Sequence, residues 1–189
     1  MIQGDSVEYD LLAKWSNFDC DGHHSCEIGV RDGMGSKIIM DNIKNNYIHT
    51  GVDPYANLNY QHYDHNDHTG AYQCDYTDEM RDTMLNDLKS YRNAGKFHLA
   101  NMTDTLFMFD PYYKDIKYAF VHFDGPHMTR DVLTEAVWFA NRAADNSRFI
   151  FDDYPNYNMQ LVSNCLKPFG FRPMQQGNNK ICLEKNEVE

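Results

Sequence analysis

The sequence predicts an α/β fold, in which a doubly wound and mostly parallel sheet closes with an antiparallel C-terminal hairpin. Short apolar runs alternate with segments of helical periodicity, which is the pattern of a parallel sheet covered by helices. The last two apolar runs are joined only by Gln-Gln-Gly-Asn-Asn. That connection is too short for a parallel crossover and suits a hairpin.

Local signals place the individual elements. Asp53-Pro54 ends the second strand, since the residue before a proline is restricted in conformation. Thr77 can cap the clearest helix, and Gly95 stops it. The expected strands span residues 25–30, 47–52, 96–100, 118–123, 148–151, 171–174 and 180–184, and the expected helices span 7–15, 35–44, 78–92, 129–142 and 159–166.

The length of 189 residues predicts a single domain that buries roughly 70% of its unfolded surface. Residues 1–24 are expected to form an N-terminal helix and a loop that leads into the sheet. Residues 54–76 are rich in Tyr, His and Asn and show no periodicity. Long loops of this kind often act as lids, so we expect a lid or substrate loop here.

Composition excludes several classes of protein. With 42% hydrophobic and 14% aromatic residues, the chain is not disordered. The net charge of −11 opposes docking on nucleic acid or an anionic membrane, and suits a metal ion or a cationic cofactor. Five cysteines without a CxxC motif, and no signal-peptide pattern, indicate a reducing, cytoplasmic location. The expected partner is a small molecule, and a homodimer is possible.

A glycine-rich turn follows the first predicted strand, with the pattern Glu27-x-Gly29-x-x-x-Gly33-x-Gly35. Glycines let a ligand approach the backbone, and the start of the next helix offers free N–H groups. Ordinary turn chemistry explains these glycines equally well. Asp53 ends the second strand, where a carboxylate can accept both hydroxyls of a ribose or simply cap a turn.

Carboxylates also end the fourth and fifth predicted strands. Asp124 lies in FVHFDGPH, and Asp152 and Asp153 lie in FIFDDY. If these strands are neighbours, their ends lie about 4.8 Å apart. Three converging carboxylates are most simply stabilised by a divalent ion such as Mg²⁺, although Asp124 and Asp152 could instead cap helices.

Histidines offer two further possibilities. His127 follows Asp124 by three residues and could act as a general base or be a solvated helix-start residue. His62, His65 and His68 could bind a metal, but they lie in a polar loop with no second site in register, which favours a solvated lid.

Taken together, CEIGVRDGMGS, GVDPY, FVHFDGPH and FIFDDY resemble the motifs of class I S-adenosylmethionine-dependent methyltransferases. The chain is most similar to the metal-dependent macrocin-type O-methyltransferases and their cephalosporin-hydroxylase-like relatives. The resemblance covers roughly residues 25–184, and it implies a Rossmann-like fold with an antiparallel last strand. The family places a second carboxylate two residues after its first metal acid, and here that position is Pro126.

The resemblance also implies roles for individual residues. The glycine-rich turn would hold the methionine part of the cofactor, Asp53 its ribose and the turn 101–104 its adenine. Asp124 and His127 would be catalytic. The implied cofactor-binding residues are Glu27, Gly29, Gly33, Gly35, Ser36, Asp53, Thr103, Asp104 and Asp124, and the implied metal ligands are Asp124, Asp152 and Asp153.

A mechanism follows from the chemistry of the cofactor. Its sulfonium methyl group is already activated, so the protein must align the acceptor oxygen and make it nucleophilic. A metal does so by lowering the pKa of a bound hydroxyl, which suits a sugar or a catechol-like acceptor. The expected function is therefore Mg²⁺-assisted O-methylation. The alternatives are a metal-dependent nucleotide-sugar transferase and an inactive cofactor-binding relative.

Overall fold

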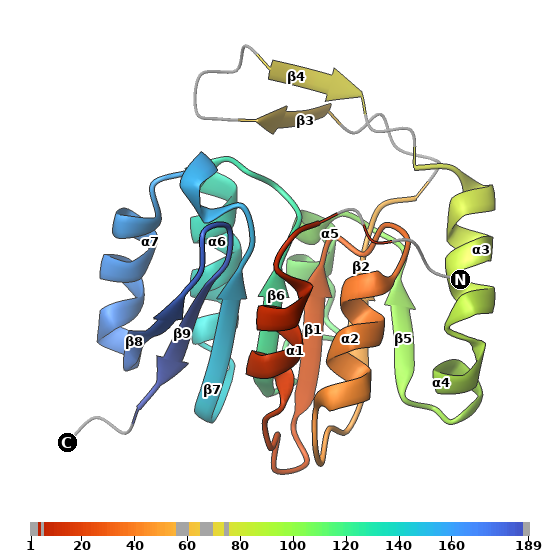
Figure 1. Cartoon of the computed structure of the whole chain (residues 1–189), viewed down its shortest axis with the longest axis horizontal. Coiled ribbons are helices and arrows are strands. Elements are labelled where there is room, and N and C mark those ends of the chain that lie inside the picture. Colours follow the sequence, from red (N-terminus) through yellow and green to blue (C-terminus); the bar gives the residue numbers. More distant parts are fainter. Residues whose placement is uncertain (1–3, 5, 56–60, 65–69, 74–75, 187–189) are drawn as a thin grey trace.

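A mixed sheet forms the centre of the structure, a computed structural model that describes residues 4, 6–55, 61–64, 70–73 and 76–186 (Figure 1). Its strands are β1 (His24–Ile28), β2 (His49–Val52), β5 (Phe97–Ala100), β6 (Tyr118–Phe123), β7 (Ala143–Phe151), β8 (Phe171–Gln176) and β9 (Ile181–Lys185). They lie in the order β5-β2-β1-β6-β7-β9-β8. Pairing is parallel from β5 to β7, and β9 is antiparallel to both β7 and β8. The predicted Rossmann-like fold is confirmed.

Helices cover both faces of this sheet, as Figure 1 shows. Alternate strand residues point to opposite faces, so that Val121 packs with α5, α6 and α7 while Ile150 packs with α1 and α2. The helices are α1 (Tyr9–Ser16), α2 (Met34–Asn42), α3 (Asp78–Asp87), α4 (Lys89–Asn93), α5 (Asp104–Phe109), α6 (Thr129–Ala140) and α7 (Met159–Leu166).

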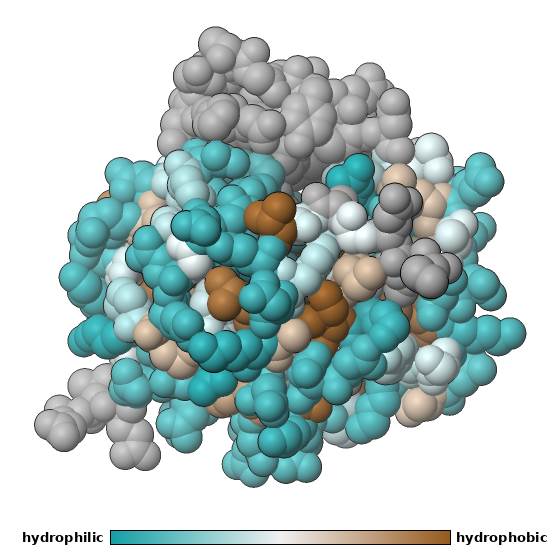
Figure 2. Space-filling model, in the orientation of Figure 1, coloured by the Kyte–Doolittle hydropathy of each residue, from teal (hydrophilic) through white to brown (hydrophobic). Residues whose placement is uncertain are grey.

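Apolar side chains concentrate inside these layers. The face shown in Figure 2 is mostly hydrophilic, with only small separate apolar spots. Within the described residues, no helix has the length and apolar character that crossing a membrane requires.

Three elements differ from the sequence-based expectation. The expected helix over 78–92 breaks at Leu88, and the fifth strand begins five residues earlier than expected, at Ala143. Helix α5 was not expected, because its sequence DTLFMF shows no clear periodicity. Its N-cap is Thr103, whose side chain accepts a hydrogen bond from the Leu106 N–H.

The segment 54–76, expected to be a loop, contains a two-stranded antiparallel hairpin of β3 (Gln61–Asp64) and β4 (Gly70–Gln73). Figure 1 shows this hairpin beyond the carboxyl ends of the parallel strands. His65 and His68 lie outside the described residues. The hairpin places this segment on the side of the sheet where ligands bind in such folds.

Candidate active site

A cavity of about 440 Å³ opens beside the carboxyl ends of β1 and β6. Here the strand order reverses, since β2 lies on one side of β1 and β6 on the other. Connections that leave in opposite directions create a crevice at this point of an open α/β sheet. The volume falls within the range of roughly 300–1,000 Å³ that is usual for small-molecule sites.

Gly29 allows the turns after β1 and β6 to touch. Its φ is +84°, and a Cβ atom there would overlap the carbonyl oxygen of Asp124 and lie 2.6 Å from the carbonyl carbon. The Asp124 N–H donates to the Ile28 carbonyl at 2.8 Å, which fixes the same contact. Only glycine fits, and Gly29 and Asp124 both line the cavity.

Gly35 leaves room for the carboxylate of Glu27. A Cβ on Gly35 would collide with Glu27 Oε1. That oxygen lies 2.8 Å from His122 Nδ1, and Oε2 accepts a hydrogen bond from Ser36. Glu27 is 1% exposed, so the paired carboxylate forms a fixed part of the cavity wall at the start of α2.

Three of the predicted cofactor-binding residues are not among the described residues that line the cavity. A Cβ on Gly33 would meet Met84 Cγ at 2.8 Å, so Gly33 serves the packing of α2 against α3. Ser36 is fully buried against Glu27, and Thr103 caps α5. Asp104, the neighbour of Thr103, does reach the cavity.

Asp53 lies at the end of β2 with one carboxylate oxygen committed and one available. Its Oδ2 accepts from the N–H groups of Val30 and Arg31, each at 2.9 Å. Oδ1 is buried and has no hydrogen-bond partner among the described residues. Asp53 lines the cavity, so Oδ1 can accept a hydroxyl of a bound ligand.

The pKa of Asp53 makes ligand binding dependent on pH. Burial raises this pKa to about 6, and the N–H groups of Arg31 and Val30 offset the shift only in part. Hydroxyl donors favour the ionised carboxylate, so binding below this pKa releases a proton. We expect the affinity for a ligand whose hydroxyl donates to Oδ1, measured by calorimetry, to rise by up to about tenfold per pH unit as the pH increases from about 5 to about 6, and then to level off.

Asp53→Asn is the control, because its weaker binding should not change over the same pH window. Constant affinity in the unmodified protein would contradict a titrating Asp53.

The stability of the ligand-free protein depends on pH in the opposite direction. A raised pKa stabilises the folded state below about pH 4, and this contribution of about 3 kcal/mol is lost as the pH rises through about 6.

A second group of polar residues lines the same cavity. Asp124 follows β6, His127 lies in the turn before α6, and Asp153 follows β7. His127 Nε2 lies 3.1 Å from Asp153 Oδ2, and one ligand atom from each of the three residues lies within 4.8 Å of the others. The predicted convergence of strand-end acids therefore exists for Asp124 and Asp153, with His127 as the third member.

Asp152 does not join this group. Its Oδ2 contacts the ammonium of Lys180 and the hydroxyl of Ser6 instead. Burial opposes its ionisation, but electrostatic interactions with His122 and Lys180 and the hydrogen bonds from Lys180 and Ser6 more than compensate, so the pKa of Asp152 lies below its usual value. The sequence suggests a third metal acid here, and the structure shows an ion pair inside the protein.

Comparison with known proteins identifies the family. A family model described as "Methyltransferase domain" matches residues 26–154, which carry the glycine-rich turn, Asp53, Asp124 and Asp153. The chain belongs to this family of S-adenosylmethionine-dependent methyltransferases. No curated protein matches the sequence. The predicted class of S-adenosylmethionine-dependent methyltransferases is thus confirmed, while the metal-dependent subtype stays a prediction.

Solved structures share the fold of the methyltransferase at low sequence identity. An rRNA methylase described as putative, from Clostridium thermocellum, has a TM-score of 0.62 at 10% identity and covers 99% of each chain. The O-methyltransferase TomG from Streptomyces achromogenes, solved with S-adenosylmethionine, gives 0.60 at 10% identity and covers 99% of this chain and 82% of its own. The N-methyltransferase NodS from Bradyrhizobium japonicum gives 0.57 at 9% identity, covering 95% and 86%.

The cavity of the methyltransferase fits its cofactor. Gly29 and Gly35 let the turn pack closely against Asp124 and the Glu27 carboxylate in the cavity wall. The buried Oδ1 of Asp53 needs a donor that a ribose hydroxyl supplies. Both features line the same cavity, and the N–H groups of Val30 and Arg31 join them through Asp53 Oδ2.

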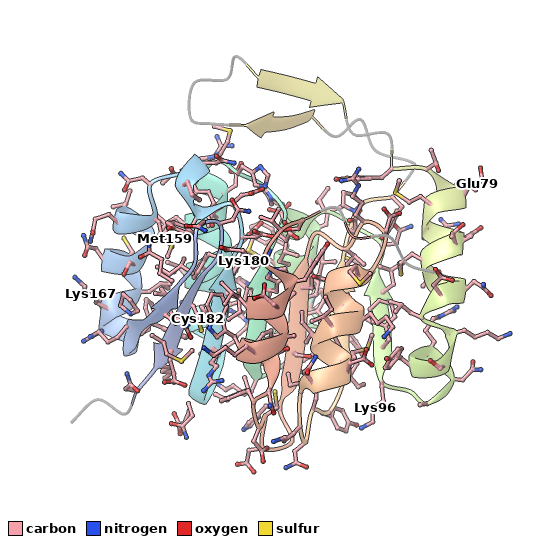
Figure 3. All side chains as sticks on the ribbon, viewed as in Figure 1. Glu79, Lys96, Met159, Lys167, Lys180 and Cys182 are labelled. Carbon is pink, nitrogen blue, oxygen red and sulfur yellow. The ribbon has the colours of Figure 1, made fainter. Side chains whose placement is uncertain are left out.

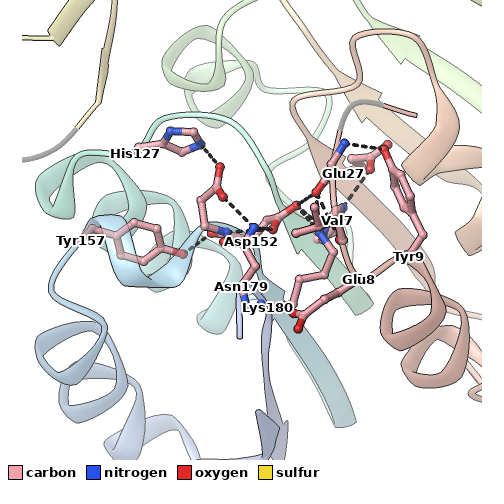
Figure 4. Close-up of polar contacts among 12 residues, drawn as sticks. Val7, Glu8, Tyr9, Glu27, His127, Asp152, Tyr157, Asn179 and Lys180 are labelled. Carbon is pink, nitrogen blue, oxygen red and sulfur yellow. Dashed lines mark hydrogen bonds and ion pairs between the residues drawn. The ribbon is translucent and has the colours of Figure 1, made fainter. Parts of the chain in front are cut away.

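Sequence reasoning missed the contribution of the two chain ends. Ser6, Val7 and Tyr9 precede or begin α1, and Asn179 lies in the turn between β8 and β9, yet all four line the cavity. Figure 4 shows Val7, Tyr9 and Asn179 beside Asp152 and Glu27. No motif marks these residues in the sequence, because their roles depend on contacts between distant segments.

Proposed function

We propose that this methyltransferase is an O-methyltransferase, assisted by a divalent cation such as Mg²⁺, that acts on a small hydroxylated acceptor of the sugar or catechol-like class. The observation that carries the proposal is the group of Asp124, His127 and Asp153 in the wall of the cavity that also contains Asp53. Two carboxylates and an imidazole form a donor set suited to a divalent ion. TomG, an O-methyltransferase, and NodS, an N-methyltransferase, share the fold about equally, so the choice of oxygen as the acceptor atom rests on this donor set.

Each part of the wall then has a chemical task. Asp53 and the turn at Gly29 hold the nucleoside and methionine portions of the cofactor, which fixes the sulfonium methyl. Asp124, His127 and Asp153 hold the cation, which when bound lowers the pKa of an acceptor hydroxyl. The acceptor hydroxyl would release its proton to solvent and its oxygen would bond to the methyl carbon, while the carbon–sulfur electron pair would stay on sulfur and leave a neutral thioether.

The charge of the protein favours binding of the cofactor over binding of its product. The chain carries a net charge of −11, and Glu27, Asp53, Asp124 and Asp153 line the cavity. A negative field stabilises the cationic sulfonium more than the neutral product. Product release is therefore favoured after transfer.

Chelation separates the cofactor role from the proposed cation role. We expect EDTA to leave the affinity for S-adenosylhomocysteine unchanged, and to abolish transfer of a radiolabelled methyl group to a panel of catechols and sugar diols. Mg²⁺ or Mn²⁺ should restore the transfer. Asp153→Asn should behave like the chelated enzyme, whereas Asp145→Asn, an exposed carboxylate at the opposite end of β7, should not.

Two outcomes would contradict the proposal in different ways. Full methyl transfer in EDTA would show that no cation is needed. The pair of His127 and Asp153 would then be the candidate general base. Binding of S-adenosylhomocysteine without transfer to any acceptor of the panel, with or without added cation, would favour an inactive cofactor-binding relative.

A further inference from the structure

Lys180 is a fully buried lysine directly behind the cavity wall. It precedes β9, and Figures 3 and 4 show it between the C-terminal hairpin and the N-terminal segment. Its ammonium contacts Asp152 Oδ2, donates to Ser6 Oγ at 2.9 Å, and lies 5.8 Å from the centre of the Tyr9 ring. A buried ammonium requires a close anion, so Lys180 and Asp152 must be considered as one unit.

The oxygens of Asp152 are fully occupied by this unit. Oδ2 accepts from Lys180 and from Ser6 Oγ at 2.7 Å. Oδ1 accepts from the Asp153 N–H at 2.8 Å and from Asn179 Nδ2 at 3.0 Å. A carboxylate offers about four lone-pair sites, so Asp152 has no capacity left for a metal ion or an acceptor.

The same unit fixes the conformation of Asp153. Its backbone is left-handed, with φ of 48°, which is unfavourable for a residue other than glycine. The Asp153 N–H is tied to Asp152 Oδ1, and Asn179 Nδ2 donates to Asp153 Oδ1 at 2.7 Å. The second oxygen of Asp153 is thereby directed at His127 Nε2.

We propose that Lys180 is a positioning residue for the part of the cavity wall that contains Asp124, His127 and Asp153. Its ammonium takes the place of a bound cation at Asp152, so that Asp152 and Asn179 orient Asp153 toward His127. Asp124, His127 and Asp153 alone then hold the cation. This inference rests on the proposed function, because it assigns which acids serve the site. Lys180 acts through Asp152 and does not itself line the cavity.

Binding of Mn²⁺ to the protein saturated with S-adenosylhomocysteine tests the assignment, with calorimetry as the readout. Lys180→Met should weaken Mn²⁺ binding by at least about tenfold, since loss of a residue that orients a metal ligand typically has this effect. Adding Asp152→Asn should recover most of the affinity, because the double variant removes both buried charges and keeps an oxygen for the Asp153 N–H. The affinity for S-adenosylhomocysteine should change by less than about twofold.

Lys185→Met is the matched control, since Lys185 ends β9, the strand that Lys180 precedes, but contacts Ala143 and Asp145 away from the cavity. It should bind Mn²⁺ like the unmodified protein. If Asp152 is itself a ligand, the order reverses: Lys180→Met would bind Mn²⁺ more tightly, and the double variant would bind it worst. That order overturns the proposal.

If the unmodified protein binds no Mn²⁺, the proposed cation is wrong, but the positioning role of Lys180 is still open to test. Crystal structures of the variants then provide the readout. Lys180→Met should then show the His127–Asp153 pair separated, and the double variant should show it restored. An intact pair in Lys180→Met overturns the role of Lys180. If Lys180→Met does not fold, the double variant decides, and a folded double variant that has lost the pair also overturns it.

Discussion

Gly29→Ala is expected to abolish cofactor binding and to lower the free energy of unfolding by several kcal/mol. The new methyl group would overlap the Asp124 carbonyl oxygen, which belongs to rigid backbone, and would force the turns after β1 and β6 apart. Left-handed strain contributes about 1–2 kcal/mol and overpacking about 1–3 kcal/mol more. Urea unfolding measures the stability, and calorimetry with S-adenosylhomocysteine measures the binding.

Gly22→Ala separates strain from collision. Gly22 also has a positive φ, +76°, but no atom lies within 4 Å of the position that a Cβ would take. This variant should lose only the strain contribution of about 1–2 kcal/mol and should bind the cofactor normally. Equal losses of stability in the two variants would show that the contact between the two turns is not tight.

Asp53→Ala is expected to weaken binding of S-adenosylhomocysteine by about 100-fold at pH 7.5. The substitution removes the acceptor for the ribose and leaves the N–H groups of Val30 and Arg31 without their partner. The two lone pairs of Oδ1 can accept both ribose hydroxyls. Two such hydrogen bonds to a charged group, at about 1.5 kcal/mol each, correspond to this loss. Calorimetric titration at a fixed pH above the pKa of Asp53 measures it.

Asp32→Ala is the control for Asp53→Ala. Asp32 lies in the glycine-rich turn but not among the described residues that line the cavity. Removing its charge changes the net charge by the same amount, so a general electrostatic effect would appear in both variants. A comparable loss of affinity in Asp32→Ala would argue against a specific ribose contact at Asp53.

The fold could be predicted because its signals are local. Apolar runs and helical periodicity recur along the chain, and the short Gln-Gln-Gly-Asn-Asn connection forces an antiparallel end. Helix α5 escaped prediction because one short turn sequence, DTLFMF, carries no periodicity. The hairpin of β3 and β4 lies in a polar segment whose composition resembles a loop.

The candidate site was only partly predictable, because strand ends specify position but not partners. The pairing of β6 with β7 brings Asp124 beside the Asp152-Asp153 pair, as the sequence predicts. The pairing of Asp152 with Lys180 escaped prediction because Lys180 lies 28 residues later and resembles the polar flank of an apolar strand. A sequence shows which carboxylates can converge, but not which of them is already paired with a buried lysine.

Glu8 links the beginning of the chain to its end, and this has a consequence for biosynthesis. Its carboxylate accepts the N–H groups of Asn178, Asn179 and Lys180, residues made at least 170 positions later. During translation Glu8 therefore lacks these hydrogen-bond donors until the hairpin of β8 and β9 has left the ribosome. The part of the cavity wall that contains Ser6 and Asn179 can therefore form only after both segments have been synthesised.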